Sequence, residues 1–171
     1  MKRLLFLLLP LSLLAAPAQI ILIRNAETSP DQTALSLKGR LRSTALAPFF
    51  QGAPSVLFYG LPIAIFAGEE SKETVASLAN EIGVPVSEKF QTPQALANEL
   101  LTNPDYEGRM VLVCWPHEEM AELAKKLGAK KAPKKWSNDS FDRLWTITFD
   151  DKEKIVFNDL PQKLLYGDSE K

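Results

Sequence analysis

Apolar residues along the chain alternate between short continuous runs and longer stretches with helical spacing. Three continuous runs predict strands that are covered on both faces, and they occupy residues 19–24, 62–67 and 109–115. Four stretches with helical spacing predict amphipathic helices, at residues 35–49, 74–82, 93–101 and 118–127. Two of these helices should end at a glycine, Gly83 and Gly128. Near the C-terminus, two short apolar runs at 145–149 and 155–157 flank a charged segment and predict a hairpin.

This alternation of strands and helices predicts an α/β fold. Helices should cover both faces of a mostly parallel central sheet, as a three-layer α/β/α sandwich, and the C-terminal hairpin should add an antiparallel edge. In the first helix, Leu37, Leu41, Ala45 and Phe49 are expected to form the apolar face. Ligands of such sheets bind beyond the carboxyl ends of the strands, where Arg24-Asn25 and His117 lie.

The N-terminus has the pattern of an export signal. Met1-Lys2-Arg3 is basic, and residues 4–16 are apolar apart from Pro10 and Ser12. This run is shorter than the roughly 20 residues that span a bilayer, and small residues follow it at Ala16-Pro17-Ala18. The sequence therefore predicts a signal peptide at 1–18, a single domain at 19–171 and an extracytoplasmic location, periplasmic or secreted. No cysteine follows the run, which excludes a lipoprotein anchor, so no stable membrane anchor is expected.

Composition excludes several classes of function. Twenty basic and 21 acidic residues give a formal charge of -1, so a broad basic face for nucleic acid is not expected. The lysines from Lys130 to Lys135 read as a solvated loop. One cysteine, Cys114, and one histidine exclude an internal disulfide and a multi-cysteine or multi-histidine metal site, and no cofactor is expected. The oligomeric state stays open.

Several fragments resemble the histidine phosphatase superfamily, which includes the phosphoglycerate mutases. Its hallmark is Arg-His-Gly or Arg-His-Ala after the first strand, and here residues 20–27 read Ile-Ile-Leu-Ile-Arg-Asn-Ala-Glu, followed by Leu37 and Gly39-Arg40. The similarity continues in order through the rest of the chain, at Glu73-Thr74, residues 111–117, Ala124, Leu127-Gly128, Trp136, Phe141-Asp142-Arg143, Trp145, Leu160-Pro161-Gln162, Leu164-Leu165 and Gly167-Asp168. The resemblance implies a phosphoglycerate mutase-like fold over nearly the whole predicted mature chain.

The resemblance also implies roles for individual residues. Members of this superfamily transfer a phosphoryl group to a histidine on the first loop, while arginines hold the phosphate and a carboxylic acid protonates the leaving group. Arg24 stands at the first phosphate-binding arginine, Asn25 at the nucleophile and His117 at the second active-site histidine. Lys72 lies near the position of the second arginine. The acid could be Glu27 or Glu118.

The residue at position 25 decides the expected chemistry. The amide nitrogen of Asn25 is delocalised into its carbonyl and has no basic lone pair, so no phosphoenzyme can form there. Lys72 can neutralise charge but cannot make a bidentate planar contact with phosphate. The sequence therefore predicts a secreted pseudoenzyme that holds a phosphorylated small molecule or a similar anion. Two alternatives stay open: a phosphomonoesterase in which His117 activates water without a covalent intermediate, and an extracytoplasmic scaffold domain without a ligand.

Overall fold

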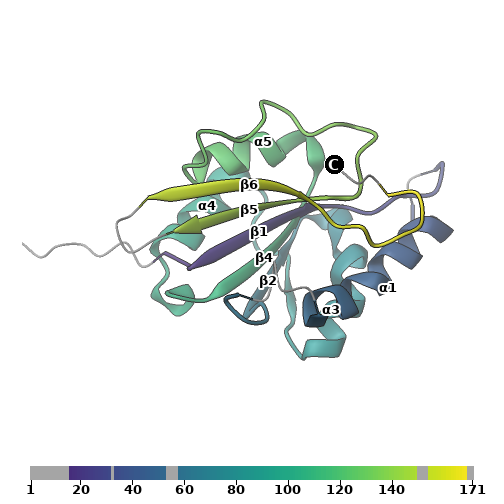
Figure 1. Ribbon diagram of the computed structural model, residues 1–171, viewed down its shortest axis with the longest axis horizontal. Helices are drawn as coiled ribbons and strands as arrows, with labels where there is room; N and C mark the ends of the chain where they lie inside the picture. The colour runs from purple at the N-terminus through teal and green to yellow at the C-terminus, as the bar shows by residue number, and fades with distance from the viewer. Residues whose placement is uncertain (1–15, 32, 53–57, 150–153, 169–171) are drawn as a thin grey trace, which may run out of the picture.

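The computed structural model describes residues 16–31, 33–52, 58–149 and 154–168. Its strands are β1 (Gln19–Arg24), β2 (Ala64–Ala67), β3 (Val86–Ser87), β4 (Met110–Trp115), β5 (Arg143–Phe149) and β6 (Ile155–Pro161). Its helices are α1 (Leu37–Gly52), α3 (Lys72–Ile82), α4 (Pro93–Thr102) and α5 (His117–Lys126), with short 3-10 turns η1 (Glu69–Ser71) and η2 (Pro104–Tyr106). Figure 1 shows how these elements are arranged.

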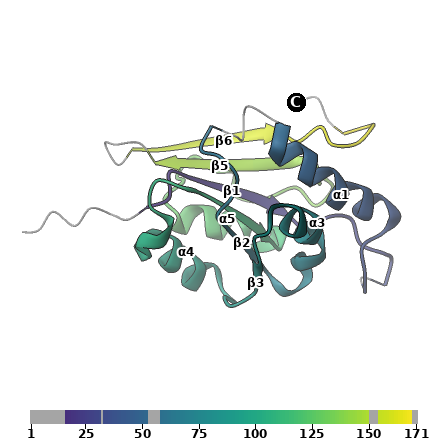
Figure 2. The ribbon, with the colours of Figure 1, turned by 90° about the horizontal axis from the view of Figure 1, so that it is seen from below.

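The strands form one sheet in the order β3-β2-β4-β1-β5-β6. The first four strands of this order run parallel, and β5 and β6 add an antiparallel edge to β1. Figure 2 shows β6 at the edge of the sheet opposite β3. The predicted mostly parallel sheet with a C-terminal antiparallel hairpin is confirmed.

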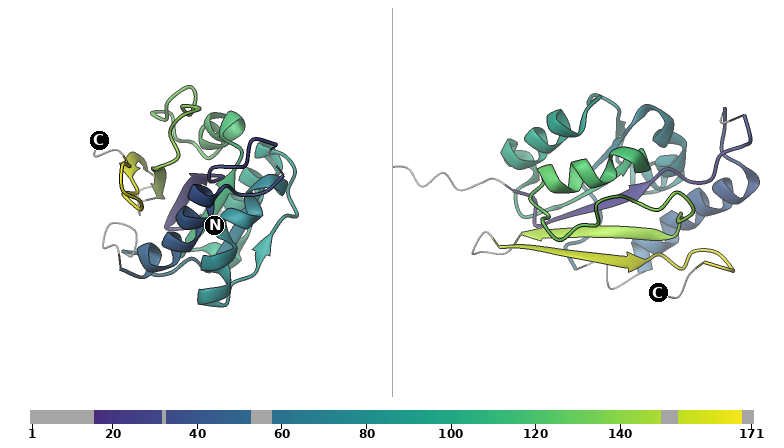
Figure 3. Two further views of the ribbon diagram at one scale, coloured as in Figure 1. Left: turned by 90° about the vertical axis from the view of Figure 1, so that its right-hand side faces the viewer. Right: turned by 90° about the horizontal axis from the view of Figure 1, so that it is seen from above.

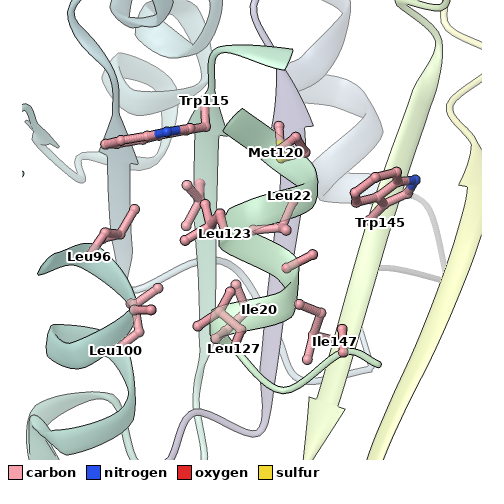
Figure 4. Close-up of a cluster of buried hydrophobic side chains, with 14 of the residues drawn as sticks. Ile20, Leu22, Leu96, Leu100, Trp115, Met120, Leu123, Leu127, Trp145 and Ile147 are labelled. Atoms are coloured by element: carbon pink, nitrogen blue, oxygen red, sulfur yellow. The ribbon is translucent and has the colours of Figure 1, made fainter. Parts of the chain in front are cut away.

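Alternate residues of the central strands face two separate helix layers. Ile20 and Leu22 of β1 pack in a cluster with α4 and α5, part of which is seen in Figure 4. Ile21 and Ile23 pack on the opposite face, with side chains of α1 and α3. All four β1 side chains are at most 1% exposed, and full burial of such a side chain stabilises the fold by about 1.5–3 kcal/mol. These two clusters make the fold a three-layer sandwich, which can be followed end-on in Figure 3.

The predicted elements agree with the observed ones to within a few residues. The predicted strand at 19–24 coincides with β1, and α3 ends at Gly83 in the left-handed conformation, with φ of 70°. A glycine adopts this conformation without steric cost. The short strand β3 and the turns η1 and η2 have no counterpart in the sequence prediction, because segments of two or three residues carry no periodicity.

The predicted apolar face of α1 is wrong. Leu37 and Leu41 are 70% and 54% exposed, whereas Arg42 is buried on the inner side of the helix together with Leu46 and Phe50. Gly39 explains this rotation, since a Cβ atom there would lie 2.0 Å from the carbonyl oxygen of Glu27. The helix therefore turns Gly39 toward the loop after β1, and Leu37 and Leu41 face solvent.

The predicted signal peptide lies mostly outside the described residues. Of the segment 1–18, the structure describes Ala16–Ala18, where the carbonyl oxygen of Ala18 accepts a hydrogen bond from the amide of Phe149 at 3.1 Å. The charged turn of the C-terminal hairpin, at 150–153, also lies outside them. Among the described residues, no helix combines the length and the apolarity needed to cross a bilayer.

Candidate active site

Two predicted site residues meet at the carboxyl end of the sheet. β1 and β4 are parallel neighbours that pair Arg24 with Trp115 at their last positions. The chain leaves β4 through Pro116, and His117 is the first residue of α5. As a result, Nη2 of Arg24 lies 3.2 Å from Nδ1 of His117.

Backbone carbonyls occupy most of the remaining hydrogen-bonding capacity of Arg24. We call residues 136–141, which cross over this end of the sheet, the strap. Nη1 of Arg24 donates to the carbonyl oxygen of Asn138 at 2.8 Å and makes longer contacts with those of Ser137 at 3.3 Å and Ser140 at 3.5 Å. Nε reaches the carbonyl oxygen of Asn25 at 3.3 Å. The guanidinium has five N–H donors, so this set of contacts leaves little capacity for an anion.

Burial also changes the electrostatics of Arg24. The residue is 5% exposed, and its guanidinium carbon lies 3.8 Å from the ring centroid of Phe141 in the strap. Burial lowers the pKa of Arg24 to about 10, although the carboxylates of Glu118 and Glu27 oppose the shift. Neutral carbonyls solvate the cation but do not neutralise it. The site therefore retains a partly uncompensated positive charge.

The surroundings of His117 favour its neutral form. Burial and the positive charge of Arg24 lower its pKa below the ordinary value, and Glu118 opposes the shift. Since an arginine only donates, Nδ1 of His117 must accept the hydrogen bond from Arg24, which places the ring proton on Nε2. The carboxylate of Glu118 also lies 3.0 Å from Nδ1, but its side chain is 69% exposed and is free to turn into solvent.

Asn25 faces a cavity whose charged residues are both acidic. This cavity has a volume of about 210 Å³, and we call it the acid-lined cavity. It is lined by Asn25, Thr28, Thr33, Ala34, Leu35, Glu70 and Glu73. Glu73 accepts a hydrogen bond from the amide of Leu35 at 3.2 Å, and this contact holds its carboxylate in place. A phosphate at Asn25 would therefore meet two carboxylates.

Lys72 does not join the Arg24 contacts. It is the first residue of α3, and its ammonium group pairs with Glu88 on exposed surface. The structure therefore brings together Arg24 and His117, while Lys72 is engaged elsewhere and Asn25 lines the acid-lined cavity.

Glu27 belongs to a group of charges that we call the ion cluster, formed with the largely buried side chains of Arg42 and Asp168 and with the exposed Lys38. Arg42 donates to both oxygens of Glu27, at 2.9 and 3.0 Å, and to both oxygens of Asp168, at 2.8 and 2.9 Å. Burial acts to raise the pKa of Glu27 and of Asp168, but hydrogen bonds from Arg42 outweigh it and both pKa values are lowered. Glu27 is thus held ionised, which makes it a poor proton donor. Glu118, which is exposed beside His117, is the more accessible of the two candidate acids.

The ion cluster and the strap enclose a second cavity, of about 350 Å³. Its lining residues are Glu27, Lys38, Arg42, Ser137, Asp139, Ser140, Phe141, Asp142, Gly167 and Asp168. Sequence analysis did not single out Arg42 or Asp168 as site residues, because the helical spacing in α1 suggested a different inner face. Among the described residues, no three histidine, cysteine or acidic side chains gather as a metal site would require.

Several solved structures have a fold similar to that of this chain. The SixA protein of Agrobacterium tumefaciens matches with a TM-score of 0.53 at 12% identity, over 84% of this chain and 98% of that protein. The protein histidine phosphatase SixA in complex with tungstate matches with a TM-score of 0.55 at 16% identity, over 84% and 97% of the two chains. The chain has the histidine phosphatase fold.

A third similar structure, a mycobacterial glucosyl-3-phosphoglycerate phosphatase in complex with inorganic phosphate, has a TM-score of 0.52 and 15% identity, over 84% of this chain and 95% of the other. No family model matches the sequence, and no curated protein matches it. The similarity to these solved structures confirms the phosphoglycerate mutase-like fold expected from the sequence. At these identities the similarity describes the fold, and the site has to be interpreted from its own residues.

Proposed function

We propose that the chain is a pseudophosphatase, a protein with the histidine phosphatase fold that forms no phosphohistidine. The observation that carries the proposal is the chemistry at position 25, which the resemblance assigns to the nucleophile. An amide cannot attack phosphorus, and the carboxylates of Glu70 and Glu73 in the same cavity disfavour a phosphate dianion. Arg24, assigned to the phosphate, binds the strap instead.

Phosphate is the first ligand to test. Two of the similar structures hold tungstate or inorganic phosphate, which supports an anion of this class as a ligand of the fold. In this chain, an anion could meet Arg24 and His117 only by displacing the carbonyl oxygen of Asn138 from Nη1. We expect such binding to be weak because the anion has to replace a well-formed hydrogen bond.

Hydrolysis by direct attack of water is disfavoured by the hydrogen bonding of His117. The alternative mechanism needs a basic ring nitrogen, but Nδ1 accepts from Arg24 and Nε2 carries the proton. An assay of the purified protein with an aryl phosphate tests the proposal. We expect no turnover above that of a His117→Ala variant. Strong turnover that His117→Ala abolishes would refute the pseudophosphatase.

The contacts of Arg24 also favour a second candidate, a scaffold domain that binds no anion. Thermal unfolding in phosphate separates the two. For a dissociation constant near 1 mM, about 10 mM phosphate should stabilise the protein by about 1.4 kcal/mol. This corresponds to a rise in melting temperature of roughly 3–6 °C, which an Arg24→Ala variant should lose and an Arg40→Ala variant should keep. Equal shifts in all three proteins, as general salt effects produce, would favour the scaffold.

We also propose that the protein acts outside the cytoplasm, after cleavage behind Ala18. The basic start, the short apolar run and the sequence Ala-Pro-Ala support this proposal. N-terminal sequencing of the protein recovered from cell fractions tests it, and the expected first residue is Gln19. A chain recovered from the cytoplasm with Met1 intact would contradict export.

A further inference from the structure

Cationic side chains are concentrated in the segment that joins α5 to the strap. Lys130, Lys131, Lys134 and Lys135 are all exposed, and no acidic residue occurs between Glu122 and Asp139. We call residues 129–136 the basic loop. It lies in the green segment along the upper edge of the molecule in Figure 1.

Buried residues fix the basic loop at both ends. Ala129 is 3% exposed, and its amide donates to the carbonyl oxygen of Ala124 at 2.9 Å. Trp136 is also 3% exposed, its indole nitrogen donates to the carbonyl oxygen of Ser140 at 2.7 Å, and its ring centroid lies 4.6 Å from that of Trp145. The four lysines are therefore held close together on an anchored segment.

The four lysines of the basic loop have no ion-pair partner in the part of the chain that the structure describes. Among the described residues, no carboxylate lies within 4.0 Å of any of its four lysines, whereas Lys38, Lys72 and Lys126 all have acidic partners. The formal charge of the whole chain is -1, so the residues outside the basic loop carry -5. Four like charges held together repel one another and destabilise the fold, and such a local conflict is expected where a surface has a binding role.

We propose that the basic loop is a contact surface for an anionic phospholipid bilayer, to which the protein attaches reversibly. A flat anionic surface attracts such a cluster of exposed lysines within the screening length of about 10 Å. Nucleic acid fits less well, because single strands bind through stacking on exposed aromatic rings and the only aromatic residue of the loop, Trp136, is buried. The proposal does not depend on the pseudophosphatase.

Co-sedimentation of the full chain with lipid vesicles tests the proposal. The vesicles are phosphatidylcholine alone or phosphatidylcholine with about one third phosphatidylglycerol, at low and high salt. One variant replaces the four lysines of the basic loop by glutamine. A matched control makes the same change of net charge at four separate exposed positions, with glutamine at Arg40, Lys89, Arg109 and Lys163. Both variants keep the N-terminal apolar run, so its contribution is the same in each.

We expect wild type to prefer anionic over neutral vesicles and to lose the preference in high salt. A lysine near an anionic surface strengthens binding by about fivefold, so the loop variant should bind anionic vesicles more than tenfold more weakly. The control should stay within about threefold of wild type. Equal binding to both vesicle types, equal losses in the two variants, or tighter lysine-dependent binding to single-stranded RNA than to vesicles would each overturn the proposal.

Discussion

Replacing Arg24 by alanine should destabilise the fold and not merely empty a binding site. The strong hydrogen bond to Asn138 at 2.8 Å is worth about 2 kcal/mol for a charged donor, and the longer contacts with Asn25 and Ser137 about 0.5–1 kcal/mol each. The contact with the ring of Phe141 adds about 1 kcal/mol. These favourable contributions together amount to about 4–5 kcal/mol.

Burial of the charge opposes this gain. The pKa of Arg24 is lowered to about 10 from an ordinary value of 12.5, and at about 1.36 kcal/mol per pKa unit the buried cation costs roughly 3 kcal/mol. In the alanine variant this cost disappears, but the carbonyl oxygen of Asn138 loses its donor, which costs about 1–3 kcal/mol. We therefore expect Arg24→Ala to lower the free energy of unfolding by about 2–5 kcal/mol.

Urea denaturation followed by tryptophan fluorescence measures this loss. Trp136 lies in the strap against Trp145, so the same signal reports whether the strap is displaced. Arg24→Lys should recover little stability, because an ammonium group cannot reach the carbonyls that the planar guanidinium contacts. Arg40→Ala, which changes an exposed arginine of α1, should stay within about 0.5 kcal/mol of wild type. An Arg24→Ala variant as stable as wild type would refute the structural role, since residues that serve only a ligand can be removed without loss of stability.

Three further predictions test other parts of the structure. Gly39→Ala should destabilise by more than about 2 kcal/mol through its contact with backbone, whereas Gly52→Ala, with no atom within 4 Å of the new Cβ, should be neutral in the same denaturation assay. Asp168→Asn should cost about 2 kcal/mol at neutral pH. Folding lowers the pKa of Asp168, so the stability that its carboxylate contributes is present above a pH of about 4 and is lost as the pH falls. The denaturation midpoint of the variant should therefore depend less on pH, between about 5 and 2, than that of wild type. NMR titration of the single histidine should give a pKa for His117 below its ordinary value, and Arg24→Gln should raise it by removing the neighbouring positive charge; an unchanged pKa would contradict the contact.

The secondary structure could be predicted from the sequence because each long element has its own periodicity. Strand order could not, since it depends on which strands pair across long stretches of chain. The prediction of the inner face of α1 was wrong for a related reason. An arginine such as Arg42 is expected on the surface, and its partner Asp168 is 126 positions later in the sequence. Hydrophobic spacing identifies a helix, but a buried ion pair can override the face it suggests.

The candidate site was predictable only where strand topology determines it. Parallel neighbours end at the same edge of a sheet, and this brings Arg24 and His117 together. The strap was not predictable, because its contribution consists of backbone carbonyls, which every residue has. The oxygen of Asn138 that binds Arg24 lies 114 positions along the chain, and no side-chain pattern marks it.

The charge balance around Arg24 links the proposed loss of catalysis to the contacts of the strap. A phosphate would bring both hydrogen-bond acceptors and negative charge to the guanidinium, whereas the strap supplies acceptors alone. Burial lowers the pKa of Arg24, and the neutral carbonyls of the strap bring no negative charge to offset that shift. An entering anion would therefore gain electrostatic energy at Arg24 but would have to break the bond to Asn138 and approach Glu118. In the proposed pseudophosphatase, no covalent step follows binding at Asn25, and the strap contacts stabilise the fold without any cost to turnover.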